Sequence, residues 1–132
     1  MRISKTVSYA IAAIAQLALH RSDSPLSTAK IACGAQVPER YLMQIMKALK
    51  DAGLLEATRG VRGGYKLAKP IGWITLQDVC DAVDGRHIPE TLAIQSLSAT
   101  SQRLIVDVLA DIADDERRRL GGFALDALQS SN

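Results

Sequence analysis

The chain has 132 residues, which is enough for one domain with a modest hydrophobic core. Apolar residues make up 48% of it and aromatic residues 4%, which is typical of a soluble globular protein, and no apolar run is long enough to span a membrane. The apolar stretch 9–19 is interrupted by Gln16 and is followed by no cleavage site, so we expect no signal peptide, no membrane contact and a cytoplasmic location.

The net charge of +2 hides an asymmetry. Residues 1–70 carry 11 Lys or Arg against 4 Asp or Glu, and residues 71–132 carry 5 against 10, so the two halves have net charges of +7 and −5. A basic first half suits a polyanionic partner such as nucleic acid, although an ordinary solvated surface is the alternative.

The first predicted element is a helix over Thr6–His20, because its apolar residues keep helical spacing. We expect its inner face to consist of Ile11, Ile14, Ala15 and Ala18. The polar turn 21–25, which ends in proline, stops this helix.

Two further helices follow in close succession. Ser27 can cap a short helix over Thr28–Ala35 in which Ile31 and Ala32 face inward. The next helix is predicted to start with Pro38 as its first residue and to end at Ala52, with Gly53 as the left-handed stop. Its buried stripe would consist of Leu42, Ile45, Met46 and Leu49. A short helix and a longer one joined by a tight connection indicate a helix-turn-helix.

A β-hairpin is predicted directly after this pair. Residues Leu54–Thr58 can form one strand and Tyr65–Ala68 the other, joined by the basic, glycine-rich turn Arg59–Gly64. Such a hairpin is a wing with arginines at its tip. We expect Trp73, which follows it, to pack the wing against the next helix, with a place in a ligand pocket as the alternative.

The last third of the chain contains two predicted helices. Thr75 and Asp78 form a capping-box pattern for the first, which ends at Asp84-Gly85 and has Leu76, Val79, Cys80 and Val83 on its inner face. Residues 86–99 look irregular, and a long helix is expected over Thr100–Leu120. The apolar stripe of this long helix is too large for one small head to cover, which predicts a dimer interface, with packing onto its own head as the alternative. The stripe consists of Leu104, Ile105, Val108, Leu109 and Ile112.

The expected fold is therefore mainly α with a small β-wing. Residues 1–85 form a winged helix-turn-helix head, and residues 86–132 form a connecting loop and a dimerisation helix, the two parts making one compact unit.

Several short motifs follow one another along the chain: Met1-Arg2-Ile3-Ser4, Tyr41-Leu42, Arg59-Gly60, Gly63-Gly64-Tyr65 and Ala82-Val83-Asp84-Gly85. Together these motifs resemble the Rrf2 family of bacterial regulators, which includes IscR, NsrR and CymR. The resemblance implies a homodimer that binds a near-palindromic promoter operator, usually as a repressor, and thus a nucleoid-associated, sequence-specific DNA-binding transcriptional regulator. A winged-helix protein-interaction module without DNA binding is the alternative, and nothing in the chain suggests an enzyme.

The third helix would enter the major groove with its N-terminal end first. Arg40 can donate two hydrogen bonds to guanine, and Gln44 suits adenine in the same way. Tyr41 can reach a phosphate or stack, and Glu39 and Met43 lie on the same exposed turns, although each of these residues could instead belong to a solvated helix face. The family pattern usually has a small hydroxyl residue where Arg40 stands and a glutamate where Met43 stands, so we expect a different operator.

The predicted wing adds further contacts. Arg59 matches the family's wing arginine and could enter a narrow minor groove. Arg62 and Lys66 would neutralise phosphates.

Many family members hold an iron–sulfur cluster through three cysteines. Leu92, Ser98 and Leu104 stand at those positions and cannot supply thiolates, so we expect no cluster, and no metal-ligand spacing occurs elsewhere. A small ligand or a protein co-regulator could supply the signal instead.

The two cysteines have different expected roles. Cys80 fits a buried core position. Cys33 falls off the inner face of its helix, close to Lys30, and is either a candidate redox thiol or an incidental surface cysteine.

Overall fold

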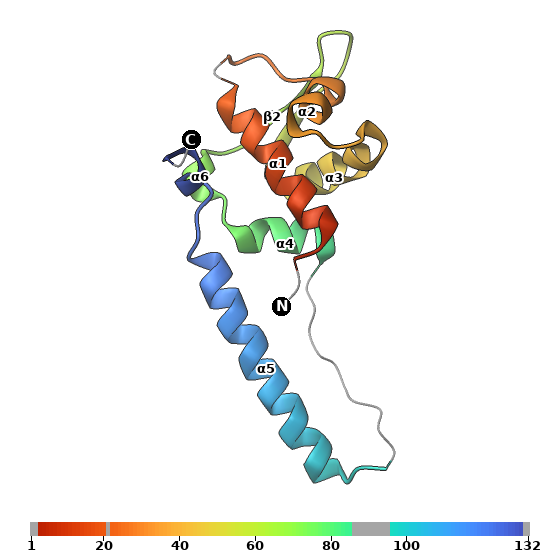
Figure 1. The fold of residues 1–132 in the computed structure, drawn as a ribbon, viewed down its shortest axis with the longest axis vertical. Helices are drawn as coiled ribbons and strands as arrows, with labels where there is room; N and C mark the ends of the chain where they lie inside the picture. Colours follow the sequence, from red (N-terminus) through yellow and green to blue (C-terminus); the bar gives the residue numbers. More distant parts are fainter. Residues whose placement is uncertain (1–2, 21, 86–95, 131–132) are drawn as a thin grey trace.

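The computed structural model describes residues 3–20, 22–85 and 96–130. It consists of a mainly helical head from which one long helix projects (Figure 1). This architecture confirms the predicted fold class. The elements are α1 (Lys5–Leu19), α2 (Thr28–Ala35), α3 (Glu39–Asp51), β1 (Leu55–Thr58), β2 (Gly64–Leu67), the short 3-10 helix η1 (Ile71–Trp73), α4 (Leu76–Asp84), α5 (Ala99–Gly121) and α6 (Ala127–Ser130).

Side-chain caps explain where several helices begin. The Ser27 hydroxyl accepts the Lys30 N–H at the start of α2, and Thr75 and Asp78 form the predicted capping box of α4. Pro38 is the N-cap of α3 and not its first helical residue, since its ψ of 129° is extended. The left-handed φ of 80° at Gly53 ends this helix, as predicted.

Helix α1 lies at the centre of the head, where it contacts α2, α3 and α4. Because three helices surround it, its buried face is wider than one stripe and differs from the predicted one. Ile14 is fully buried as expected, but Ile11, Ala15 and Ala18 are only half-buried. The core is instead lined by Val7, Ala10, Ala13, Ile14 and Leu17.

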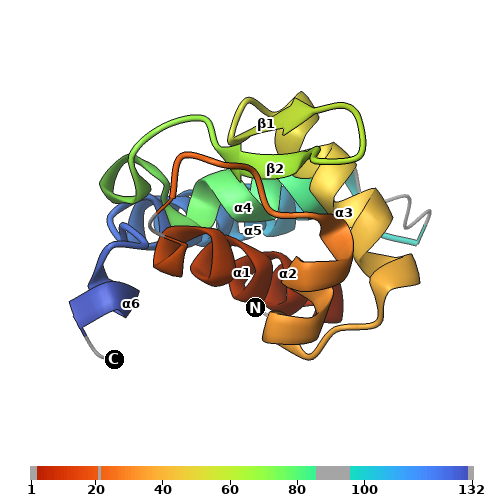
Figure 2. The same cartoon turned by 90° about the horizontal axis from the view of Figure 1, so that it is seen from above.

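The wing is a two-stranded antiparallel hairpin in which Leu55 pairs with Leu67 and Thr58 with Gly64. Backbone hydrogen bonds of 2.9 and 2.8 Å between Leu26 and Tyr65 attach it to the segment before α2. Seen from above, the hairpin lies on one side of α4 and α1 on the other (Figure 2). The wing therefore has a fixed place relative to α2 and α3.

The chain returns to the head after α5. The Leu125 N–H donates to the Ile74 carbonyl at 2.8 Å, and the Leu125 side chain is fully buried. Because Ile74 points into the same core, its neighbour Trp73 points outward and is 71% exposed, so the predicted packing of Trp73 between wing and helix is wrong. Within the described ranges, no helix is both long and apolar enough to cross a membrane.

Candidate nucleic-acid interface

Helix α3 has one buried face and one solvent face. Leu42, Ile45, Met46 and Leu49 are buried, as predicted, and fix the rotation of the helix. The opposite face is therefore free to contact a partner. Each residue predicted for the interface on this helix is exposed: Glu39, Arg40, Tyr41, Met43 and Gln44.

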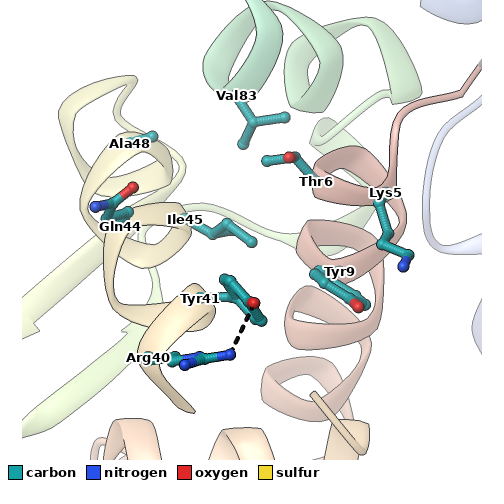
Figure 3. Close-up of a pocket in the computed structure, with 9 residues that line it drawn as sticks. All are labelled: Lys5, Thr6, Tyr9, Arg40, Tyr41, Gln44, Ile45, Ala48 and Val83. Atoms are coloured by element: carbon teal, nitrogen blue, oxygen red, sulfur yellow. Dashed lines mark hydrogen bonds between the residues drawn. The ribbon is translucent and has the colours of Figure 1, made fainter. Parts of the chain in front are cut away.

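Arg40 and Tyr41 form a pair on this surface. The Arg40 Nη2 donates to the Tyr41 hydroxyl at 2.9 Å, and the guanidinium carbon lies 4.7 Å from the centre of the Tyr41 ring. Tyr41 faces α1 across a groove, with Arg40 beside it at the groove's edge (Figure 3). Tyr41 is thus placed on the flank of α3, and Arg40 nearer its outer face.

The structure adds Lys47 to this surface, a residue that the sequence reasoning missed. Lys47 is exposed and lies three positions after Gln44 and seven after Arg40, a spacing that places all three on one helix face. The same periodicity that identified the buried stripe could have found it.

The wing presents two exposed arginines, Arg59 and Arg62, on either side of Val61, which is fully exposed. Lys66 is placed differently. It lies opposite Glu56 in the hairpin, and the Lys66 Nζ is 3.6 Å from the Glu56 carboxylate. This cross-strand ion pair reduces the positive charge that Lys66 can offer to a phosphate.

The apolar stripe of α5 is open to solvent. Its five residues are between 40% and 64% exposed, and α5 extends well away from the head (Figure 1). The alternative that this stripe packs onto its own head is therefore wrong. The stripe consists of Leu104, Ile105, Val108, Leu109 and Ile112.

The other end of α5 is fixed to the head. Arg117 binds the Asp81 carboxylate of α4 through two hydrogen bonds of 3.0 and 3.3 Å, and these bonds raise the pKa of the Arg117 guanidinium. Gln77 donates to the same carboxylate at 2.7 Å. The direction in which α5 leaves the head is set by these contacts and by the buried Leu125 that follows.

The residues at the family's cluster positions do not fit an iron–sulfur cluster. The Ser98 hydroxyl caps α5 by accepting the Ser101 N–H at 3.2 Å, and Leu104 is an exposed apolar residue. Leu92 lies outside the described residues. Within the described ranges, no three His, Cys, Asp or Glu side chains are grouped so that they could hold a metal ion.

The two cysteines lie where the sequence predicted them. Cys33 is exposed on α2, and Cys80 is buried on α4. Burial raises the pKa of the Cys80 thiol, and the charges of Asp84 and Asp81 raise it further.

A winged head with an exposed, partly basic helix face is a fold that many regulators share, and comparison with known proteins decides the family. Residues 3–131 match the Rrf2 family, whose description is iron-dependent transcriptional regulator. The chain belongs to the Rrf2 family. The resemblance inferred from the sequence is thereby confirmed.

Relatives of this Rrf2 chain include transcriptional regulators from several bacteria. IscR of Cereibacter sphaeroides is 38% identical over 86 residues, which are 64% of this chain and 56% of that protein. IscR of Xenorhabdus nematophila is 34% identical over 84 residues, which are 64% of this chain and 51% of that protein. The chain thus spans about half the length of these relatives.

Solved structures of Rrf2-type regulators share the fold along its whole length. CymR (YrzC), the global cysteine regulator of B. subtilis, is 26% identical with a TM-score of 0.75, covering 100% of this chain and 98% of CymR. IscR of T. potens is 26% identical with a TM-score of 0.72, covering 100% of this chain and 89% of that protein.

Proposed function

We propose that this Rrf2 chain is a sequence-specific DNA-binding transcriptional regulator that acts as a homodimeric repressor. The observation that carries the proposal is the solvent face of α3, where the exposed side chains of Arg40, Gln44 and Lys47 stand in line. Arg and Gln side chains form the bidentate contacts that read guanine and adenine. Membership of a family of transcriptional regulators supports the same conclusion.

In this proposal α3 lies in the major groove and the wing reaches the adjacent minor groove. Arg59 enters that minor groove, and Arg62 neutralises a phosphate. Two heads joined through the exposed stripe of α5 would present two copies of α3, so the operator is near-palindromic, with half-sites about 34 Å apart or a multiple of that distance. The DNA partner also implies a cytoplasmic location.

We propose that this chain binds no iron–sulfur cluster. Leu92, Ser98 and Leu104 lack the thiolates that ligation requires, and Ser98 already caps α5. Protein purified without oxygen should be colourless and free of iron and acid-labile sulfide. A brown preparation with stoichiometric iron would contradict this expectation.

The signal would then be a small ligand, a partner protein or oxidation of the exposed Cys33 thiol. If the thiol is the sensor, mild peroxide should lower operator affinity, reductant should restore it, and Cys33→Ser should abolish the response. A peroxide response that persists in Cys33→Ser would exclude the thiol.

The competing function is a winged-helix protein-interaction module that does not bind DNA. We propose no catalytic activity, in keeping with relatives that are transcriptional regulators. A mobility-shift titration with fragments of the protein's own genome separates the two functions, and sequencing the retained fragments identifies the operator. Retention of a small set of fragments that share an inverted repeat is expected, whereas no retention at low salt would contradict DNA binding.

A further inference from the structure

A groove runs between α1 and α3 on the flank of the exposed helix face (Figure 3). Its volume is about 990 Å³. Ile45 and Val83 lie on its inner side, and Tyr9 of α1 faces Tyr41 of α3 across it. The space is therefore bounded by aromatic rings and apolar side chains, and it is large enough for a ligand group.

The charged side chains that line this groove are all cationic, and its other polar groups are three hydroxyls and the Gln44 amide. Lys5 and Arg40 bring two positive charges, and Thr6, Tyr9 and Tyr41 bring hydroxyl groups. Among the described residues that line the groove, none is acidic. A space edged by cations and hydroxyl donors, with no carboxylate to neutralise them, selects an anion.

The Tyr41 hydroxyl has one donor left for such an anion. Its oxygen accepts the hydrogen bond from Arg40 at 2.9 Å, so its own hydrogen is free to donate. Tyr41 thereby lies between Arg40, which is proposed to read a base, and whatever occupies the groove. The hydrogen bond that Tyr41 donates to the occupant would be stronger if the occupant were charged.

The position of the groove identifies the anion. A helix in the major groove has a sugar–phosphate strand on each of its flanks. Helix α3 contacts α1 on one side and β1 of the wing on another, so the wing approaches one strand and the groove faces the other. We propose that the α1–α3 groove holds a phosphodiester of the operator, which Lys5 binds by charge and Tyr9 and Tyr41 bind through their hydroxyl groups. This inference rests on the proposed function and adds α1 to the DNA-contacting elements.

The first test compares the salt dependence of DNA binding. Lys5→Gln should lower the slope of log K against log[salt] by about 0.9 for each head. The affinity for the operator and for an unrelated duplex should fall by the same factor, because a phosphate contact carries no base information. Tyr9→Phe should keep the slope and weaken binding to both duplexes roughly three- to tenfold for each head, because each head loses one hydrogen bond. The matched control is Arg103→Gln, which removes one charge from an exposed side chain near the distal end of α5 and should leave both values unchanged.

A second measurement locates the phosphate. Neutral methylphosphonate linkages are placed one at a time along the operator. One linkage in each half-site should weaken binding of the wild-type protein more than binding of Lys5→Gln, which has lost the charge contact and keeps only the hydroxyl contacts of Tyr9 and Tyr41. Inorganic phosphate at constant ionic strength should not displace the DNA.

Four results would overturn the inference. A salt slope unchanged by Lys5→Gln, or a methylphosphonate profile identical in wild type and Lys5→Gln, would place the phosphate elsewhere while leaving DNA binding intact. Displacement by inorganic phosphate that Lys5→Gln abolishes would show instead a site for a small free anion. Failure of the wild-type protein to bind DNA would refute the proposed function and this inference together.

Discussion

Arg40 makes two contacts with Tyr41: it donates a hydrogen bond to the Tyr41 hydroxyl, and its guanidinium stacks on the Tyr41 ring. This arrangement reduces the number of rotamers that Arg40 must give up on meeting a base. Arg40→Ala should therefore relax base preference at one position in each half-site and cost about 1–3 kcal/mol for the preferred base. Competition binding with single-base variants of the operator measures this loss.

Arg59→Ala is the natural comparison, because the wing arginine is expected to sense groove width. Its loss should weaken binding to every sequence, and most strongly where A·T-rich flanks narrow the minor groove. Equal losses for both variants on all sequences would mean that Arg40 reads no base.

The two thiols should behave differently in solution. Ellman's reagent should label the exposed Cys33 quickly and the buried Cys80 slowly. Because burial raises the Cys80 pKa in the folded state, the protonated thiol favours folding. That contribution is fully present below the pKa of the unfolded chain and is lost as pH rises through the raised value. The free energy of unfolding, measured by urea titration at increasing alkaline pH, should therefore fall more steeply for the wild type than for Cys80→Ala. Parallel curves of this free energy against pH would contradict the assignment.

The attachment of the wing to the head requires a glycine at position 64. A Cβ on Gly64 would collide with the Leu26 carbonyl, at the point where the hairpin is bonded to the segment before α2. Gly64→Ala should cost more than the roughly 1–3 kcal/mol of a strained backbone alone and should loosen the wing. Gly60→Ala is the control, because its φ of 111° is strained for alanine but its Cβ would meet nothing within 4 Å. Thermal unfolding and hydrogen exchange at Tyr65 distinguish the two, and equal losses would refute the role of the collision.

The elements could be predicted from the sequence where the signal was local. Periodicity gave the stripe of α3, and the Thr75–Asp78 spacing gave the capping box. The inner face of α1 could not be obtained in this way, because it depends on three helices that surround it. The Lys66–Glu56 ion pair required the register of the hairpin, and the burial of Leu125 required knowing that the chain returns to the head.

The candidate site was predictable to a similar extent. Exposure of Arg40, Gln44 and Arg59 followed from residue type and helix or hairpin position. The contact between Arg40 and Tyr41, and the groove that Tyr41 shares with Tyr9, depend on how α1 crosses α3. Such crossings arise from tertiary packing, which no local pattern records.

At the scale of the whole molecule, the exposed stripe of α5 predicts a dimer. Val108→Asp combined with Ile112→Asp should give monomers, because charges would be buried without partners at the interface. Operator binding should weaken, since each monomer holds only one half-site. Arg103→Asp, which adds negative charge elsewhere on the same helix, is the control. Sedimentation equilibrium measures the assembly, and a wild-type monomer at micromolar concentration would contradict the prediction.

Among the described residues, α5 contacts the head near its C-terminal end and projects away from it. The length of this helix therefore fixes how far the head lies from the exposed stripe. Twelve residues separate Val108, in the middle of the stripe, from Leu120, where the helix rejoins the head. At 1.5 Å per residue they measure about 18 Å, so two antiparallel copies that cross at Val108 would set their heads about 36 Å apart. That length is close to one turn of B-DNA. In the proposed dimer, the distance between operator half-sites would thus be set by the number of residues between Val108 and Leu120.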